Sequence, residues 1–435
     1  MPGGRGEGGI ERAADIAALV MAKLAVGAWV LHQGFSHVSD DDYARTVIAE
    51  LFAHAPRLDP SGTSWLPLPF WVEGAAMMAA GRTLGVARAV AIAIGAASVA
   101  APYLAMRGVG ARRASAIVAT TLAMALPWNA WLGVATVPEG WSGALVAAAV
   151  VAMGRPGARP WAAAALLASS LSRYEAWPAC LVMAALCVQS ARRDGRWLRE
   201  AGCAGLSLVG PVAWMAWNAR AHGGALHFVT RVTTFRQAVG AADVPLLDKL
   251  LGYPRALVVE TPEVALLGVL GLAGFALAPL RARWGWAATG AAVTIAVLVW
   301  GDVKDGAPTH HAARALAMTW WILIGMGVDA AVTWGTRPAG RRAALASAAL
   351  AAIAWCVTLP ARWADSPGRS ASERRDGPIA RGLAMRSAEV AHAEITPCAY
   401  EHFALLAAWG SPERATVSPA TREPPGPQCP HVLTP

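Results

Sequence analysis

Residues 84–106 read LGVARAVAIAIGAASVAAPYLAM, an apolar run that only Arg88 interrupts with a charge. A helix rises 1.5 Å per residue and the hydrocarbon core of a bilayer is about 30 Å thick, so about 20 apolar residues cross it. This run is therefore long enough to cross a membrane once. Comparable runs, several of them shorter, lie at 14–31, 114–132, 137–153, 161–172, 175–189, 201–219, 262–280, 285–300, 313–333 and 343–360.

The composition of the chain agrees with many crossings. Of its 435 residues, 56% are hydrophobic and 15% are charged, and the mean hydropathy is +0.41. Soluble domains carry about 25% charged residues, so much of this chain's apolar surface must face lipid. We therefore expect an all-α polytopic membrane protein with about eleven transmembrane helices, give or take two, because Arg173-Tyr174-Glu175 interrupts the short fifth and sixth runs.

The arginines between the runs predict the orientation, since cytoplasmic connections are rich in Lys and Arg. Alternate short connections carry arginine clusters, whereas the connection 133–140 between them has no Lys or Arg. This alternation places residues 1–13 in the cytoplasm of a cell whose inner membrane holds the domain 14–360. It places the loop 32–83, the segment 220–261 and a C-terminal tail domain, 361–435, outside the cytoplasm.

The net charge of +9 does not predict nucleic-acid binding. The basic residues lie in short clusters between apolar runs and form no basic stripe with interleaved aromatic residues. Membrane lipid is the partner that this distribution favours.

The tail changes in character, because charged residues, Pro, Ser and Thr become frequent after Arg362. Residues 388–408 carry enough apolar side chains to form a small folded unit. Cys398 and Cys429 are the only cysteines of the tail, and they lie on the expected oxidising side. A disulfide between them would stabilise a unit that is too small for a large core; two unpaired thiols are the alternative.

The first long loop contains an acidic turn, His37-Val38-Ser39-Asp40-Asp41-Asp42-Tyr43, followed by residues with helical spacing. We expect Ser39 to cap this helix, and carboxylates in its first turn suit the helix dipole. The turn is then only the start of a solvated helix. A second interpretation rests on the Pro- and Trp-rich stretch 60–71, which is typical of a membrane interface. In this interpretation the acidic turn lies at the membrane surface, and one of its carboxylates acts as a general base that takes a proton from a hydroxyl group.

Four stretches, taken in order, resemble motifs of one enzyme family. They are the acidic turn with Tyr43, Thr136-Val137-Pro138-Glu139, Leu171-Ser172-Arg173-Tyr174-Glu175, and 308–316 with His310, His311 and Arg314. Together they are similar to the type C (GT-C) membrane glycosyltransferases, which include the protein O-mannosyltransferases and the aminoarabinose transferases. The resemblance covers residues 14–360, although Pro138 and Glu139 stand in reversed order and Asp41 replaces the usual Glu.

This resemblance implies an activity and a site. Such enzymes move a sugar from a polyprenyl-phosphate donor to a glycan, lipid or protein acceptor outside the cytoplasm, with an aspartate of the first loop as base. Asp40 matches that aspartate best, followed by Asp42 and Asp41. The substrate-binding candidates are Glu139, Arg173, Glu175, His310, His311 and Arg314. No cofactor is implied with certainty, and a divalent cation held by Asp40 and Asp42 stays open.

Each candidate also has a structural explanation. Arg173 and Glu175 are close enough in sequence to pair with each other, Arg314 is able to extend to the interface, and Glu139 suits a helix start. Two other functions stay open as well. A multi-span transporter or flippase would place charges near the membrane midplane, and a scaffold would use the tail to bind a partner.

Overall fold

The computed structural model describes residues 4–238, 244–304, 312–370, 373–395 and 401–418. Within these residues, five helical segments are long and apolar enough to cross a membrane. They are α1 (Gly4–His32), α4 with α5 (Leu84–Ser98 and Ala100–Gly108), α15 (Ala278–Val303), α17 (Ala317–Gly335) and α18 (Pro338–Ala364). A sixth is added if α13 (Leu246–Glu260) and α14 (Pro262–Ala273), which meet at a bend of 103°, form one broken span.

The other helices between α5 and α17 vary in length. Two of them are apolar but shorter than a span, α6 (Arg113–Ala125) and α8 (Glu139–Ala152). The others are α7 (Pro127–Leu132), α9 (Arg159–Ser170), α10 (Trp177–Asp194), α11 (Trp197–His222), α12 (His227–Ala238), α16 (Ala312–Ala315), and the 3-10 turns η1 (Pro156–Ala158), η2 (Tyr174–Ala176) and η3 (Gly274–Ala276). Every expected run thus coincides with helix.

Prolines break two of the expected spans. The run 114–132 is divided at Pro127, which begins α7, and the run 262–280 ends where Pro279 stands in the first turn of α15. Proline has no N–H to donate and favours the first turn of a helix. At Pro127 and Pro279 the helix begins anew, whereas Pro211 lies inside the unbroken helix α11.

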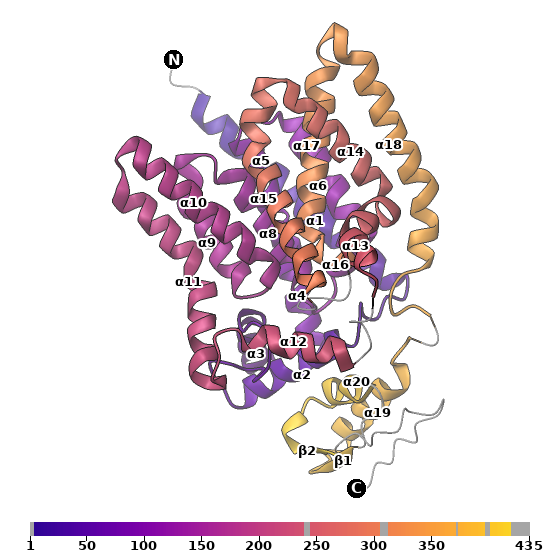
Figure 1. Cartoon of the computed structure of the whole chain (residues 1–435). Coiled ribbons are helices and arrows are strands. Elements are labelled where there is room, and N and C mark those ends of the chain that lie inside the picture. Colours follow the sequence, from indigo (N-terminus) through magenta and orange to yellow (C-terminus); the bar gives the residue numbers. More distant parts are fainter. Residues whose placement is uncertain (1–3, 239–243, 305–311, 371–372, 396–400, 419–435) are drawn as a thin grey trace.

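Most of these helices run roughly side by side, whereas α2 (Asp41–His54), α3 (Leu68–Ala80), α12 and the tail gather at the lower end of the bundle in Figure 1.

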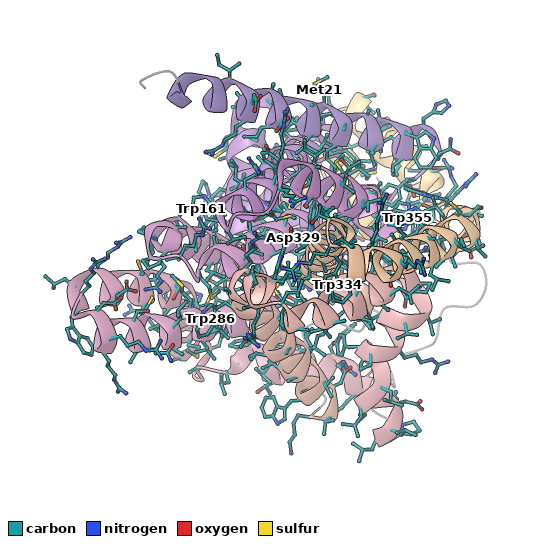
Figure 2. All side chains as sticks on the ribbon, turned by 90° about the horizontal axis from the view of Figure 1, so that it is seen from above. Met21, Trp161, Trp286, Asp329, Trp334 and Trp355 are labelled. Atoms are coloured by element: carbon teal, nitrogen blue, oxygen red, sulfur yellow. The ribbon has the colours of Figure 1, made fainter. Side chains whose placement is uncertain are left out.

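Seen from above in Figure 2, Asp329 of α17 lies near the middle, and Met21 and Trp161 lie toward the edge. Asp329 is fully buried, and it accepts hydrogen bonds from Trp284 Nε1 at 3.0 Å and Arg283 Nη1 at 3.2 Å.

The described part of the tail forms a small packed unit. It consists of α19 (Asp376–Ser387), β1 (Ala393–Ile395), α20 (Glu401–Trp409), η4 (Pro412–Arg414) and β2 (Ala415–Val417). The strands pair in parallel, Ala393 opposite Ala415, which is a departure from the expected all-helical fold. Tyr43 and Val47 of α2 share an apolar cluster with Leu405 and Trp409 of α20, so the tail packs directly on the first loop.

Gly327 permits the close approach of α14 and α17. A Cβ on Gly327 would collide with the carbonyl oxygen of Leu267, whereas a Cβ on Gly335, in the last turn of α17, would meet no atom within 4 Å. We expect Gly327→Ala to destabilise the protein by about 1–3 kcal/mol, because helices in a packed bundle separate only at the expense of other contacts. Thermal unfolding of the purified protein measures this. Gly335→Ala is the matched control, and equal stability of the two variants would contradict the prediction.

Candidate functional site

The acidic turn begins α2, but not in the way that we expected. The helix begins at Asp41 with Asp40 as N-cap, and no side chain caps it, so the prediction that Ser39 is the cap is wrong. The Oγ of Ser39 instead accepts a hydrogen bond from Arg314 Nη1 at 3.0 Å. The turn is held together by Asp42, whose Oδ2 accepts from the backbone N–H groups of Val38 and Ser39 at 3.1 and 3.3 Å.

Asp42 has a structural role that leaves it little freedom. Its side chain is fully buried, and its Oδ1 accepts from the backbone N–H of Thr136 at 3.0 Å. The hydroxyl of Thr136 donates back to the carbonyl oxygen of Asp42 at 2.8 Å. Asp42 therefore joins the first loop to the connection before α8.

Asp40 faces the tail. The guanidinium of Arg375, the N-cap residue of α19, donates from Nε to Asp40 Oδ1 at 3.0 Å and from Nη2 to Oδ2 at 3.1 Å. Paired hydrogen bonds of this fork-to-fork kind are among the stronger polar contacts in proteins. Both oxygens of the aspartate that the sequence ranked first are thus engaged by one arginine.

Asp41 is the most accessible of the three carboxylates. Its side chain is 39% exposed, and its Oδ2 lies 3.2 Å from Arg314 Nη1. Burial raises the pKa of Asp41, but the positive charges of Arg314 and Arg45 outweigh burial and hold that pKa below its ordinary value. Asp41 is therefore an ionised carboxylate that combines partial exposure with contact to a buried cation.

Four predicted residues meet in a buried ionic cluster beside Asp41. The Nε of Arg314 lies 3.0 Å from Glu139 Oε1, and the Nη1 of Arg173 lies 3.2 Å from the same oxygen. Arg173 Nε also donates to Glu175 Oε2 at 3.0 Å, which confirms the expected local pair. The side chains of Arg314 and Glu139 are each 2% exposed, so Arg314 does not extend to the interface.

These four residues come from separate elements, namely the first turn of α8, the connection before η2, η2 itself and α16. They line a cavity of about 20 Å³ together with Ser142 and Met318. That volume has room for about one water molecule. A buried charge cluster of this kind costs desolvation energy that simple packing would avoid, which makes it a candidate site rather than a stabilising feature.

Four other predicted residues, His310, His311, Cys398 and Cys429, lie outside the described residues, so the histidine contacts and the disulfide stay predictions. The carboxylate of Asp40 accepts hydrogen bonds from Arg375, and that of Asp42 accepts from backbone amides. A divalent cation at these two aspartates stays a prediction. Within the described ranges, no group of three potential ligands is close enough to hold a metal ion.

The sequence interpretation missed Arg45, which lies one helical turn after Asp41. Its side chain is buried, and its Nε and Nη1 have no hydrogen-bond partner in the described part of the chain. The guanidinium stacks over Trp65 at 4.6 Å and Phe70 at 5.5 Å from the ring centroids. The spacing of four residues between Asp41 and Arg45 suggests an ion pair on a helix surface. The sequence feature that indicates a different environment for Arg45 is the Trp-rich stretch, which supplies the aromatic rings.

Glu73 of α3 was missed as well. Burial raises its pKa to about 8, although the charge of Arg45 opposes this shift. The unfolded chain releases the proton near the ordinary pKa of 4.5, whereas the folded chain keeps it until about pH 8. Stability therefore falls as the pH rises through this window and levels off above it.

We expect Glu73→Gln to remove the contribution of Glu73 to this pH dependence, because an amide imitates the protonated acid and does not titrate. The wild type should lose about 1 kcal/mol of stability per pH unit between pH 5 and 8. Unfolding temperatures of the purified protein across this range measure it, with the exposed Glu394→Gln as control. A Glu73→Gln variant that is as sensitive to pH as the wild type would contradict the assignment.

The chain was also compared with known proteins. No protein-family model matches it, and no curated protein matches its sequence significantly. The fold is helical, with several helices that are suited to a membrane.

Proposed function

We propose that the protein is a membrane glycosyltransferase of the GT-C kind, which moves a sugar from a polyprenyl-phosphate donor to an acceptor. One observation supports this above the others. Four stretches that resemble the family's motifs contribute Asp41, Glu139, Arg173, Glu175 and Arg314 to one continuous set of ion pairs, although they lie far apart in the sequence.

The proposed reaction is a displacement at the anomeric carbon of the sugar. The acceptor hydroxyl gives its proton to a carboxylate while its oxygen forms the new bond to that carbon. The bond from the carbon to the phosphate oxygen breaks, and the polyprenyl phosphate leaves with the electron pair. Cations near the leaving phosphate stabilise the charge that develops on it.

Asp41 is the base in this proposal. Its partial exposure gives a hydroxyl access to it, whereas Asp42 is buried and Asp40 is bound by Arg375. Asp40 remains the best match by resemblance alone. Its pairing with the tail favours a role in holding the turn in place.

Arg314, Arg173 and Arg45 are the proposed cations for the phosphate. Arg314 and Arg173 already pair with Glu139 and Glu175, so a phosphate would have to share them with these carboxylates. Arg45 differs, because two of its nitrogen atoms have no partner within the described residues. A guanidinium with free donors is well matched to phosphate oxygens.

The proposed topology has about eleven crossings, with the helices α6 to α11 as additional crossings between the five apolar segments. Residues 1–13 lie in the cytoplasm, and the acidic turn and the tail lie outside it, at the inner membrane. The support is that α2, α3 and the tail gather at one end of the bundle (Figure 1).

Donor turnover by the purified full-length protein tests this proposal. Polyprenyl-phosphate hexoses and pentoses are supplied in detergent, and release of polyprenyl phosphate is measured with and without a chelator. Lipid and glycan profiling of a deletion strain then identifies the acceptor as a species that lacks one sugar. The proposal fails if no donor is turned over and the deletion strain has unchanged glycans and lipids.

A transporter or flippase is the second candidate, and Lys23 favours it. This lysine lies buried within α1, and its Nζ donates to the carbonyl oxygen of Asn129 at 2.7 Å. Charges inside membrane helices often mark transport pathways. Uptake of a labelled lipid-linked sugar into vesicles that survives Asp41→Asn but not Lys23→Met would support this alternative.

A further inference from the structure

A second and larger cavity lies between the tail and the membrane bundle. It is a groove of about 580 Å³, formed by Ser36 and Tyr43 of the first loop, residues 83–88 at the start of α4, and α19 and α20 of the tail. None of its lining residues lines the cavity of the ionic cluster. The groove is thus a separate site, which Tyr43 of the acidic turn helps to line.

The walls of the groove are mainly apolar. Leu84, Ile379 and Leu383 line it. The side chain of Leu383 is 52% exposed, which is high for a leucine. Leu84 begins the membrane-crossing segment that ends at Gly108. Because the end of such a segment lies near the bilayer surface, the groove is placed where lipid chains and headgroups are available.

Two arginines line the same groove without a carboxylate partner. Arg88 Nη2 donates to the carbonyl oxygen of Ser36 at 2.5 Å, and Arg386 Nη1 donates to that of Arg82 at 2.7 Å. Across the described residues, neither arginine has an acidic group within 4 Å. The positive charge of Arg88 acts on Asp42 and that of Arg386 acts on Glu50, in both cases over a longer distance than an ion pair. The groove therefore carries excess positive charge beside an apolar wall.

We propose that this groove binds one anionic membrane lipid. Its phosphate lies between Arg88 and Arg386, and one acyl chain follows Leu84, Ile379 and Leu383 into the bilayer. The volume is within the range of about 300–1,000 Å³ that is usual for ligand sites. A zwitterionic lipid such as phosphatidylcholine also carries a phosphate, but its trimethylammonium group adds a positive charge beside the two guanidinium groups. A headgroup with a net negative charge is therefore preferred.

Such a lipid would join the tail to the bundle. Three lining residues, Ile379, Leu383 and Arg386, belong to α19, whose N-cap residue Arg375 binds Asp40. The lipid thereby supports the position of the acidic turn. The lipid site is independent of sugar transfer, and lipid binding alone tests it.

The test uses the purified full-length protein in nanodiscs that contain equal amounts of phosphatidylglycerol and phosphatidylcholine. Lipid that remains bound after transfer to detergent is counted by native mass spectrometry. We expect preferential retention of phosphatidylglycerol. Arg88→Gln should weaken it about tenfold by removing a charged donor, and Leu383→Trp should displace the chain by filling the groove.

Two controls separate this site from general lipid contact. Arg112→Gln removes an exposed arginine that does not line the groove, and Leu350→Trp alters an exposed leucine of α18; both should retain lipid like the wild type. Size-exclusion profiles show whether each variant is folded. Unchanged retention in folded Arg88→Gln and Leu383→Trp, or equal retention of phosphatidylcholine, would overturn the proposal.

Discussion

Asp41→Asn is expected to lower sugar transfer by about 10²–10⁴-fold, the usual effect of a general base, while the protein stays folded. Asparagine has the same shape as aspartate but does not accept the proton of the acceptor hydroxyl. The carboxylate of Asp41 is partly exposed and contacts Arg314, so the substitution removes few stabilising contacts. Donor turnover measures the loss, and the thermal unfolding temperature checks the fold.

Variants of Asp40 and Asp42, the neighbours of Asp41, distinguish a general base from a carboxylate with a structural role. Asp40→Asn and Arg375→Gln break the same pair of hydrogen bonds, so we expect them to have equal and smaller effects on turnover. Asp42→Asn should mainly destabilise the protein, because its buried oxygens accept from three backbone amides. An active Asp41→Asn together with an inactive Asp40→Asn would reassign the base to Asp40.

Arg314→Gln is expected to have the second large effect, on stability as well as turnover. It leaves Glu139 buried with Arg173 as its remaining cation, and it removes the contacts to Ser39 and Asp41. Breaking a buried ion pair on one side costs about 3–5 kcal/mol. Loss of a preorganised donor to a developing anion lowers turnover by about 10²–10³-fold.

The double variant Glu139→Gln with Arg314→Gln separates these two effects. It removes both buried charges, so most of the lost stability should return while turnover stays low. The matched control is Arg159→Gln, which breaks an equally buried pair with Glu200 at 2.7 Å. Since the length of α9 separates Arg159 from Arg173, this control should destabilise the protein without lowering turnover per folded molecule. An active double variant would contradict the role of Arg314.

The helix positions were predicted well from the sequence, and each expected run coincides with helix. The reason is that an apolar run of many residues is a strong signal. The sequence predicted β1 and β2 poorly, because strands of three residues carry too little pattern. The number of crossings is left open, because α6 and α8 are apolar but short. Composition alone does not decide whether such helices cross the bilayer.

The site was predicted in part. Asp41, Glu139, Arg173 and Arg314 were all named, but their mutual contacts depend on how distant helices pack, which spacing does not reveal. The resemblance ranked Asp40 first among the three aspartates, whereas the ranking that we propose from the contacts places Asp41 first. This second ranking depends on Arg375, which lies in the tail and carries no recognisable signal. Arg45 and Glu73 were missed because they look like ordinary helix-surface charges.

The bond between Asp40 and Arg375 joins residues that are 335 positions apart. The ribosome therefore completes the first loop and nearly the entire bundle before the partner of Asp40 exists. During that interval the carboxylate of Asp40 lacks its guanidinium, and α2 lacks the apolar cover of α20. The acidic turn is assembled last although it is synthesised early, so a prematurely terminated chain contains the helices of the bundle without a finished turn.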